Sequence, residues 1–280
     1  MINPTPDDEA ALEATKAPLM EHLVELRSRL IHSVIAFGIA FGVAFYFAPR
    51  VFGFLTLPLA KALNARGITD PHLMYTALGE AFFSQVKLGM FGGLCLAFPI
   101  IGAQLWMFIA PGLYKHEKNA LLPFLLLAPV LFIVGAAFSY YVLLPTAIYF
   151  FLGYDSPGAI QGALAVQFQG KVAEYLDFVI KLILAFGLTF QMPILLGLLG
   201  KVGIVNAKQL RDMRRFAIVG MFAIAAVVTP PDPISMLALA FPLVGLYEAS
   251  ILWVAMYDRR RAREQAAREA AEASTGVTTA

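Results

Sequence analysis

Uncharged runs about as long as a membrane-spanning helix recur along this 280-residue chain. A helix needs about 20 consecutive apolar residues to cross the hydrocarbon core of a bilayer, which is about 30 Å thick. Six segments meet or approach that length: 30–49, 88–114, 119–144, 182–200, 216–229 and 233–257. Hydrophobic residues make up 59% of the chain and charged residues only 14%, which excludes an ordinary soluble domain. We therefore predict an all-α polytopic membrane protein with six transmembrane helices within residues 19–257.

Two of these runs have unusual ends. The third run stays uncharged as far as Tyr154, which is too long for one span, so we expect its helix to end near Leu144, before Pro145. The fifth run offers about 14 helical residues before Pro230-Pro231, or about 21 Å of helix. The sixth run starts directly after these prolines. We expect the fifth and sixth spans to form a tight hairpin of short helices.

The basic residues predict the orientation in the membrane, because loops that carry more Lys and Arg stay in the cytoplasm. Fifteen of the 21 Lys and Arg residues fall in the N-terminal segment, the second and fourth connections and the C-terminal tail. Only Arg50, Lys61, Arg66 and Lys171 fall in the connections on the opposite side. Both termini are therefore predicted to be cytoplasmic. Residues 1–18 would form an acidic tail, and residues 258–280 a second cytoplasmic tail.

Motifs for catalysis, nucleotide binding and metal binding are absent from the sequence. It contains no GxxxxGK[ST], no HExxH and no GxSxG, and its four His residues share no ligand spacing. The single Cys95 permits no intramolecular disulfide. A net charge of +2 gives no indication of nucleic-acid binding. We predict a protein that is not an enzyme and that has no cofactor and no metal.

Polar residues beside the predicted spans are the candidates for recognition. Glu25 and Arg29 lie four residues apart just before the first span, and Glu117 lies on a short cytoplasmic loop. Glu25 and Glu117 either pair with neighbouring basic residues or bind a cationic peptide. A carboxylate can hold an Arg guanidinium through two parallel hydrogen bonds, a geometry that Lys does not reproduce.

Two polar residues interrupt the later spans. Gln191 stands next to the Met192-Pro193 pair, and Glu248 divides the last run. An ionisable group at membrane depth indicates a functional site unless it is paired, and Arg214 or Arg215 could pair with Glu248. Gln191 either has a functional role or makes an ordinary hydrogen bond between helices. Two GxxxG pairs, Gly38–Gly42 and Gly89–Gly93, allow either internal helix packing or dimerisation.

Three motifs carry a resemblance to a known family. The segments HLVELRSRL (22–30), WMFIAPGLYKHEK (106–118) and TPPDPIS (229–235) occur in this order around six spans. Together they resemble the TatC family, the signal-recognising subunit of the twin-arginine protein translocase. The resemblance implies a cupped six-helix protein of the bacterial plasma (inner) membrane. It implies binding of the twin-arginine signal peptides of folded cargo, TatA- and TatB-type single-span partners, a homo-oligomer within the complex, and transport driven by the proton motive force.

The resemblance also implies roles for residues. Glu25 and Glu117 would receive the two arginines, with Phe108, Leu113, Arg27 and His116 around them. The other implied positions are Pro111 and Gly112 beside the recognition surface, Pro58 in a structured extracytoplasmic connection, and Thr229, Pro230, Pro231, Asp232, Gln191 and Glu248 near the contacts with partner helices. Many relatives have Glu where this chain has Gln191, so a titrating group is not expected there. Met236 stands where some relatives have a polar residue.

Other functional classes fit the sequence less well. A secondary transporter of a small solute would favour broken helices in paired halves, and we find no such repeat. An intramembrane enzyme would need a catalytic set at depth, and His32 and His72 have no suitable partners.

Overall fold

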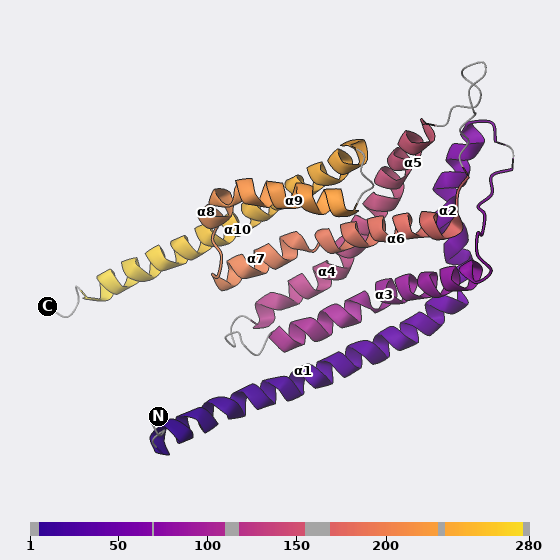
Figure 1. Ribbon diagram of the computed structural model, residues 1–280. Helices are drawn as coiled ribbons and strands as arrows, with labels where there is room; N and C mark the ends of the chain where they lie inside the picture. Colours follow the sequence, from indigo (N-terminus) through magenta and orange to yellow (C-terminus); the bar gives the residue numbers. More distant parts are fainter. Residues whose placement is uncertain (1–5, 69, 110–117, 155–168, 229–232, 277–280) are drawn as a thin grey trace, which may run out of the picture. The chain divides into compact units, whose positions relative to one another are not determined.

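The structure is a computed structural model, which describes residues 6–68, 70–109, 118–154, 169–228 and 233–276. The described residues are helical apart from their turns and one isolated parallel bridge between Met74 and Lys171. The helices are α1 (Pro6–Tyr46), α2 (Ala48–Ala65), α3 (Glu80–Ile109), α4 (Lys118–Phe138), a π-helical turn (Ser139–Leu143), α5 (Leu144–Leu152), α6 (Val172–Thr189), α7 (Met192–Val202), α8 (Ala207–Asp212), α9 (Arg214–Val228) and α10 (Pro233–Gly276) (Figure 1).

Five helical segments in the described part of the chain are long and apolar enough to cross a membrane. They are His22–Tyr46, Glu80–Leu105, Leu126–Leu152, Val172–Lys201 and Met236–Ala267. The predicted fifth span is α9, which is apolar but has only 15 residues, or about 22 Å of helix. The prediction of a short helix there is confirmed. The sixth helix is not short, because α10 continues for 44 residues from the apolar segment into the charged tail.

The chain divides into two compact units, each of which is described by itself. The first consists of Met1–Val51 and Gln85–Ala120, and the second of Phe52–Ser84 and Leu121–Ala280. In the first unit, α1 and α3 lie side by side and antiparallel (Figure 1). Their contact is close because Gly89 faces the rings of Phe41 and Phe45, and Gly93 faces the backbone of Phe41. The Gly89–Gly93 pair therefore serves internal packing, whereas a Cβ on Gly38 or Gly42 would meet nothing within 4 Å.

In the second unit, α2 contains Pro58, the structural residue predicted in the first extracytoplasmic connection. Proline has no N–H, so it cannot donate to the carbonyl of Phe54 four residues earlier. That carbonyl accepts a hydrogen bond from the Tyr140 hydroxyl at 2.7 Å instead. The Tyr175 hydroxyl donates to the next carbonyl, that of Leu55, also at 2.7 Å. Tyrosines from two other helical segments thus hydrogen-bond to α2 at the carbonyls four and three residues before its proline.

The helix that begins as α4 does not end near Leu144, so that prediction is wrong. It passes through the π-helical turn Ser139–Leu143 and continues as α5 to Leu152. Pro145 lies in the first turn of α5, directly after the wider turn, where a missing N–H is tolerated. Ser139 and Tyr140 of the π turn are buried, so packing holds this irregular segment in place.

A carboxylate fastens the start of α6. Glu80 accepts hydrogen bonds from the backbone N–H of Thr76 at 2.6 Å and of Ala77 at 3.3 Å through one oxygen. Its other oxygen accepts from the N–H of Ala173, in the first turn of α6, at 3.0 Å. The first turn of a helix has N–H groups without partners inside the helix, and Glu80 satisfies one of them from a distant segment.

We expect Gly93→Ala to destabilise the protein, because the added Cβ would lie 2.8 Å from the Cα and 2.9 Å from the N of Phe41, both of them backbone atoms. Overpacking of this kind costs about 1–3 kcal/mol. Thermal unfolding in detergent measures the effect. Gly102→Ala in the same helix is the matched control, since a Cβ there meets nothing within 4 Å. Equal stability of the two variants would contradict the packing assignment.

Candidate functional site

The first unit brings together polar side chains where the start of the apolar part of α1 lies against the end of α3. The His22 ring stacks on the Phe108 ring, with centroids 4.3 Å apart and planes 21° from parallel. About two turns further along α1, the Arg29 guanidinium donates to Gln104 Oε1 at 3.4 Å and to Met107 Sδ at 3.5 Å. The helix pair therefore presents an imidazole, a guanidinium and an aromatic ring in one place.

Glu25 belongs to the same cluster through Arg29. Arg29 Nη2 donates to Glu25 Oε1 at 3.3 Å, and the two side chains are 32% and 29% exposed. The pairing of Glu25 with Arg29, one of the two alternatives drawn from the sequence, is thus present. It consists of one long hydrogen bond, and no other described side chain bonds to Glu25. Glu25 retains the capacity to accept further hydrogen bonds.

The other predicted members of this surface are placed only in part. Arg27 is exposed, and it lies two positions from Glu25, so the two do not share a helix face. Five predicted residues lie outside the described part of the chain: Pro111, Gly112, Leu113, His116 and Glu117. The proximity of Glu25 to Glu117 stays a prediction.

Glu248 is paired in the second unit. Its two oxygens face the Arg214 guanidinium, with Nε to Oε1 at 2.7 Å and Nη2 to Oε2 at 2.8 Å. This two-point contact joins the start of α9 to α10, in agreement with the sequence-based alternative that an Arg neutralises this acid. Thr229, Pro230, Pro231 and Asp232 lie outside the described residues.

Gln191 stands at a break between helices. It follows the end of α6 and directly precedes α7, whose first turn contains Pro193. Its Nε2 donates to the Ala128 carbonyl of α4 at 3.0 Å. The helices approach closely there, because a Cβ on Gly135 would lie 2.8 Å from the Phe186 carbonyl oxygen. Gln191 therefore makes the hydrogen bond between helices that was one of its two predicted roles.

Gln104 and Met107 are parts of the cluster that sequence reasoning missed. Gln104 is a polar residue isolated in the long uncharged run 88–114, and a polar residue in such a run indicates a hydrogen bond to another helix. Among the described residues, no group of three or more His, Cys, Asp or Glu side chains could hold a metal ion.

Comparison with known proteins decides the family. Residues 21–242 match the family described as "Sec-independent protein translocase protein (TatC)". The chain belongs to the TatC family. Curated TatC proteins are 45% identical over 91% of this chain and 90% of the protein in Magnetococcus marinus, and 37% identical over 89% and 92% in Escherichia coli K12.

A solved structure agrees with this assignment. A crystal structure titled "Crystal Structure of Twin Arginine Translocase Receptor- TatC" matches with a TM-score of 0.72 at 40% identity, over 85% of this chain and 99% of that one. This TatC-family chain is therefore an all-helical, multi-pass membrane protein, as its uncharged runs predicted.

The Arg214–Glu248 pair gives a measurable coupling. Both side chains are more than a third exposed, so solvent screening limits the coupling free energy to about 1 kcal/mol or less. A double-mutant cycle with Arg214→Ala and Glu248→Ala, read by thermal unfolding, measures it. The same cycle with Arg215→Ala is the control, because Arg215 pairs with no described acid, and it should give a coupling near zero. Equal couplings in the two cycles would contradict the pairing.

Gln191→Leu should weaken the contact between α4 and the α6–α7 break, because Leu cannot donate to the Ala128 carbonyl. Hydrogen bonds between membrane helices average about 0.6 kcal/mol and reach about 1.7 kcal/mol. Gln191→Glu should retain the contact only while its carboxyl is protonated, so any loss relative to the parent should grow as the pH rises. A Leu variant as stable and as active as the parent would show that the residue has no essential polar role.

Proposed function

We propose that the protein is the signal-recognising and assembly subunit of a twin-arginine translocase, placed in a bacterial inner membrane with both termini in the cytoplasm. Membership of the TatC family supports the translocase role. The distribution of Lys and Arg supports the orientation. The six spans would be the five long segments and α9, flanked by tails at 1–18 and 258–280.

The partly exposed Glu25 carboxylate is the observation that carries the recognition role. It is held by one 3.3 Å hydrogen bond from Arg29, a weak contact that an incoming guanidinium can displace or join. One Arg of the signal peptide would bind Glu25 through two parallel hydrogen bonds, and the other Arg would bind Glu117. Phe108, held by its stack with His22, would offer an apolar surface to the residues that follow the arginines.

The partners in this proposal are single-span proteins of the TatA and TatB type. Their helices would pack on apolar faces that this chain leaves exposed, near α9, α10 and Gln191. The proton motive force would drive transport, because the sequence offers no nucleotide site. A homo-oligomer within the complex is part of the same proposal. The alternative of a secondary transporter has less support, since Glu248, the acid in the last run, is already neutralised by Arg214.

Photo-crosslinking of a twin-arginine signal peptide to the membrane-embedded protein tests the site. Glu25→Gln and Glu117→Gln should each weaken binding about 10- to 100-fold, because a hydrogen bond to a charged group contributes about 1.5–3 kcal/mol. A peptide with Lys-Lys in place of Arg-Arg should bind weakly to the unaltered protein.

Glu174→Gln is the matched control for these variants. Glu174 is an exposed acid in the first turn of α6, paired with Lys171 at 3.2 Å, and its loss should leave binding unchanged. Binding that survives in both the Glu25 and the Glu117 variant would reject the site while leaving the family assignment intact.

A further inference from the structure

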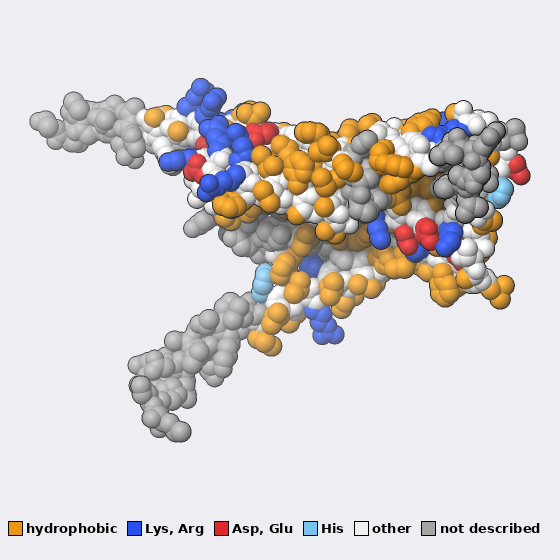
Figure 2. Space-filling model, turned by 45° about the horizontal axis from the view of Figure 1, so that its top comes forward, with side chains coloured by type: hydrophobic (Ala, Val, Ile, Leu, Met, Phe, Trp, Pro, Cys, Tyr) orange, Lys and Arg blue, Asp and Glu red, His pale blue; other side chains and the backbone are white. Residues whose placement is uncertain are grey.

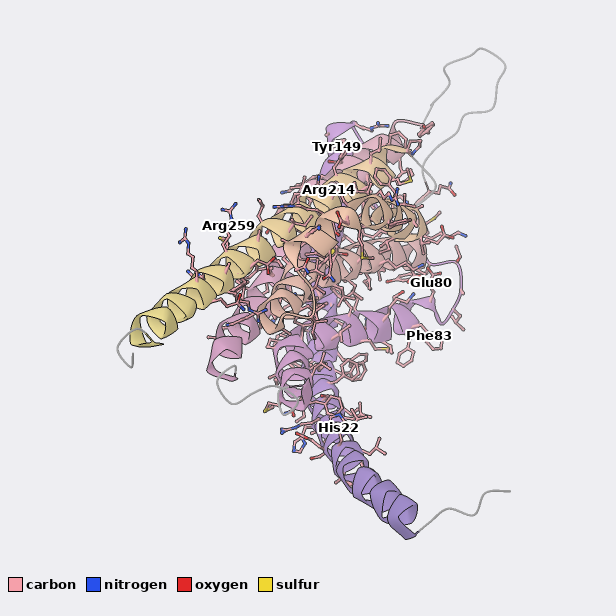
Figure 3. All side chains as sticks on the ribbon, turned by 90° about the vertical axis from the view of Figure 1, so that its left-hand side faces the viewer. His22, Glu80, Phe83, Tyr149, Arg214 and Arg259 are labelled. Carbon is pink, nitrogen blue, oxygen red and sulfur yellow. The ribbon has the colours of Figure 1, made fainter. Side chains whose placement is uncertain are left out.

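Exposed basic side chains gather at one end of the second unit, on α8, at the start of α9 and on α10 beyond its apolar part. Figure 2 shows Lys and Arg side chains concentrated over this region. Six of them are exposed and have no ion pair with any described acid: Lys208, Arg211, Arg215, Arg259, Arg260 and Arg263. Arg259 points away from α10 (Figure 3). We call these six residues the basic surface.

Hydrogen bonds hold α8 against α10, the two helices that carry most of the basic surface. The Asp258 carboxylate of α10 accepts a hydrogen bond from the N–H of Ala207, the first residue of α8, at 2.8 Å. The Tyr247 hydroxyl of α10 donates to the Leu210 carbonyl of α8, also at 2.8 Å. A capping box between Asn206 and Gln209 fixes the start of α8. The basic side chains of α8 and α10 are therefore carried by ordered, docked helices.

The described acids nearest to this surface form no ion pair with its six residues. Asp258 is engaged by the backbone of α8, and Glu248 is engaged by Arg214. Asp212 is the remaining described acid of α8 and the start of α9. The excess of positive charge favours an anionic ligand.

Exposed apolar side chains adjoin the basic ones on the same elements. Along one face of α10, Leu252 and Met256 are 65% and 56% exposed, and Arg260 and Arg263 follow at helical spacing. Beside Arg215, Met213 and Phe216 are 58% and 62% exposed. A ligand that covers both parts needs an anionic head and an apolar tail.

We propose that the basic surface binds the headgroups of anionic phospholipids in the leaflet that it faces. Clusters of four to eight Lys and Arg directly beyond a membrane helix attract anionic lipids, and each cation contributes separately. The exposed Leu252 and Met256 would lie against the acyl chains of the same lipids. This inference does not depend on signal-peptide recognition, because it uses no residue of the Glu25 cluster.

Thermal unfolding of the full chain in mild detergent, titrated with phosphatidylglycerol, tests the proposal. We expect a saturable rise in the unfolding temperature that phosphatidylcholine does not produce. Arg259→Gln/Arg260→Gln/Arg263→Gln should raise the apparent dissociation constant at least tenfold, since each cation is worth about a fivefold change. The triple Arg→Lys variant at the same positions keeps the charge and should stay within about threefold of the parent.

The control variant is Arg50→Gln/Lys61→Gln/Lys171→Gln, which removes three charges predicted on the opposite side of the membrane and should bind as the parent does. Equal loss in both Gln variants, or no loss in either, would overturn the proposal. An equal response to glycerol phosphate, which has no acyl chain, would identify a site for a free phosphate ion. Displacement by a peptide of residues 1–18, which contains four acids, would identify a protein segment as the ligand instead.

Discussion

A bilayer core offers no water to backbone N–H and C=O groups, so each break in a membrane helix must be compensated by another group in the protein. This requirement explains where the few internal polar side chains lie. The same need holds in α2, which is not one of the predicted spans, because carbonyls buried by packing also lack water: those of Phe54 and Leu55, before Pro58, accept from the Tyr140 and Tyr175 hydroxyls. At the break between α6 and α7, the Gln191 backbone N–H bonds to the Leu188 carbonyl, and the Gln191 side chain donates to the Gly187 carbonyl at 3.4 Å as well as to Ala128 of α4. Polar side chains therefore lie beside the interrupted backbone at Pro58 and at the break between α6 and α7.

The same constraint links the helix breaks to one another. Tyr140 lies within the π-helical turn between α4 and α5, and its ring stacks on Phe54 with centroids 4.3 Å apart. The wider turn thus belongs to the contact that compensates Pro58. Tyr175 lies on α6 and is buried, so α6 also depends on α2. The carbonyl that Pro58 leaves without a helical donor thus contacts the π-helical turn, and the next carbonyl contacts α6.

The sequence predicted the features that depend on composition alone. Lengths of uncharged runs located the five long segments and the short α9, because hydrophobic matching to the bilayer acts on each helix separately. It did not predict the continuation past Pro145, since that depends on the packing of Tyr140 against a distant helix. Gln104 was missed for a similar reason: one polar residue in an apolar run has no periodic pattern, and only the docking of α1 on α3 makes it a partner of Arg29. The Glu248 alternatives were resolved by geometry that spacing cannot supply.

The two described acid–arginine pairs, Glu25–Arg29 and Glu248–Arg214, differ in a way that bears on function. Glu248 and Arg214 are 34 positions apart in the sequence and join two helices through two nitrogen–oxygen contacts, at 2.7 and 2.8 Å. Glu25 and Arg29 meet at one point, at 3.3 Å, within a single helix, and Arg29 divides its donors among Glu25, Gln104 and Met107. An arginine with other acceptors available loses little when it releases the carboxylate. A peptide guanidinium that bound Glu25 would add one positive charge beside Arg29, and the partial exposure of both side chains would let solvent screen that repulsion.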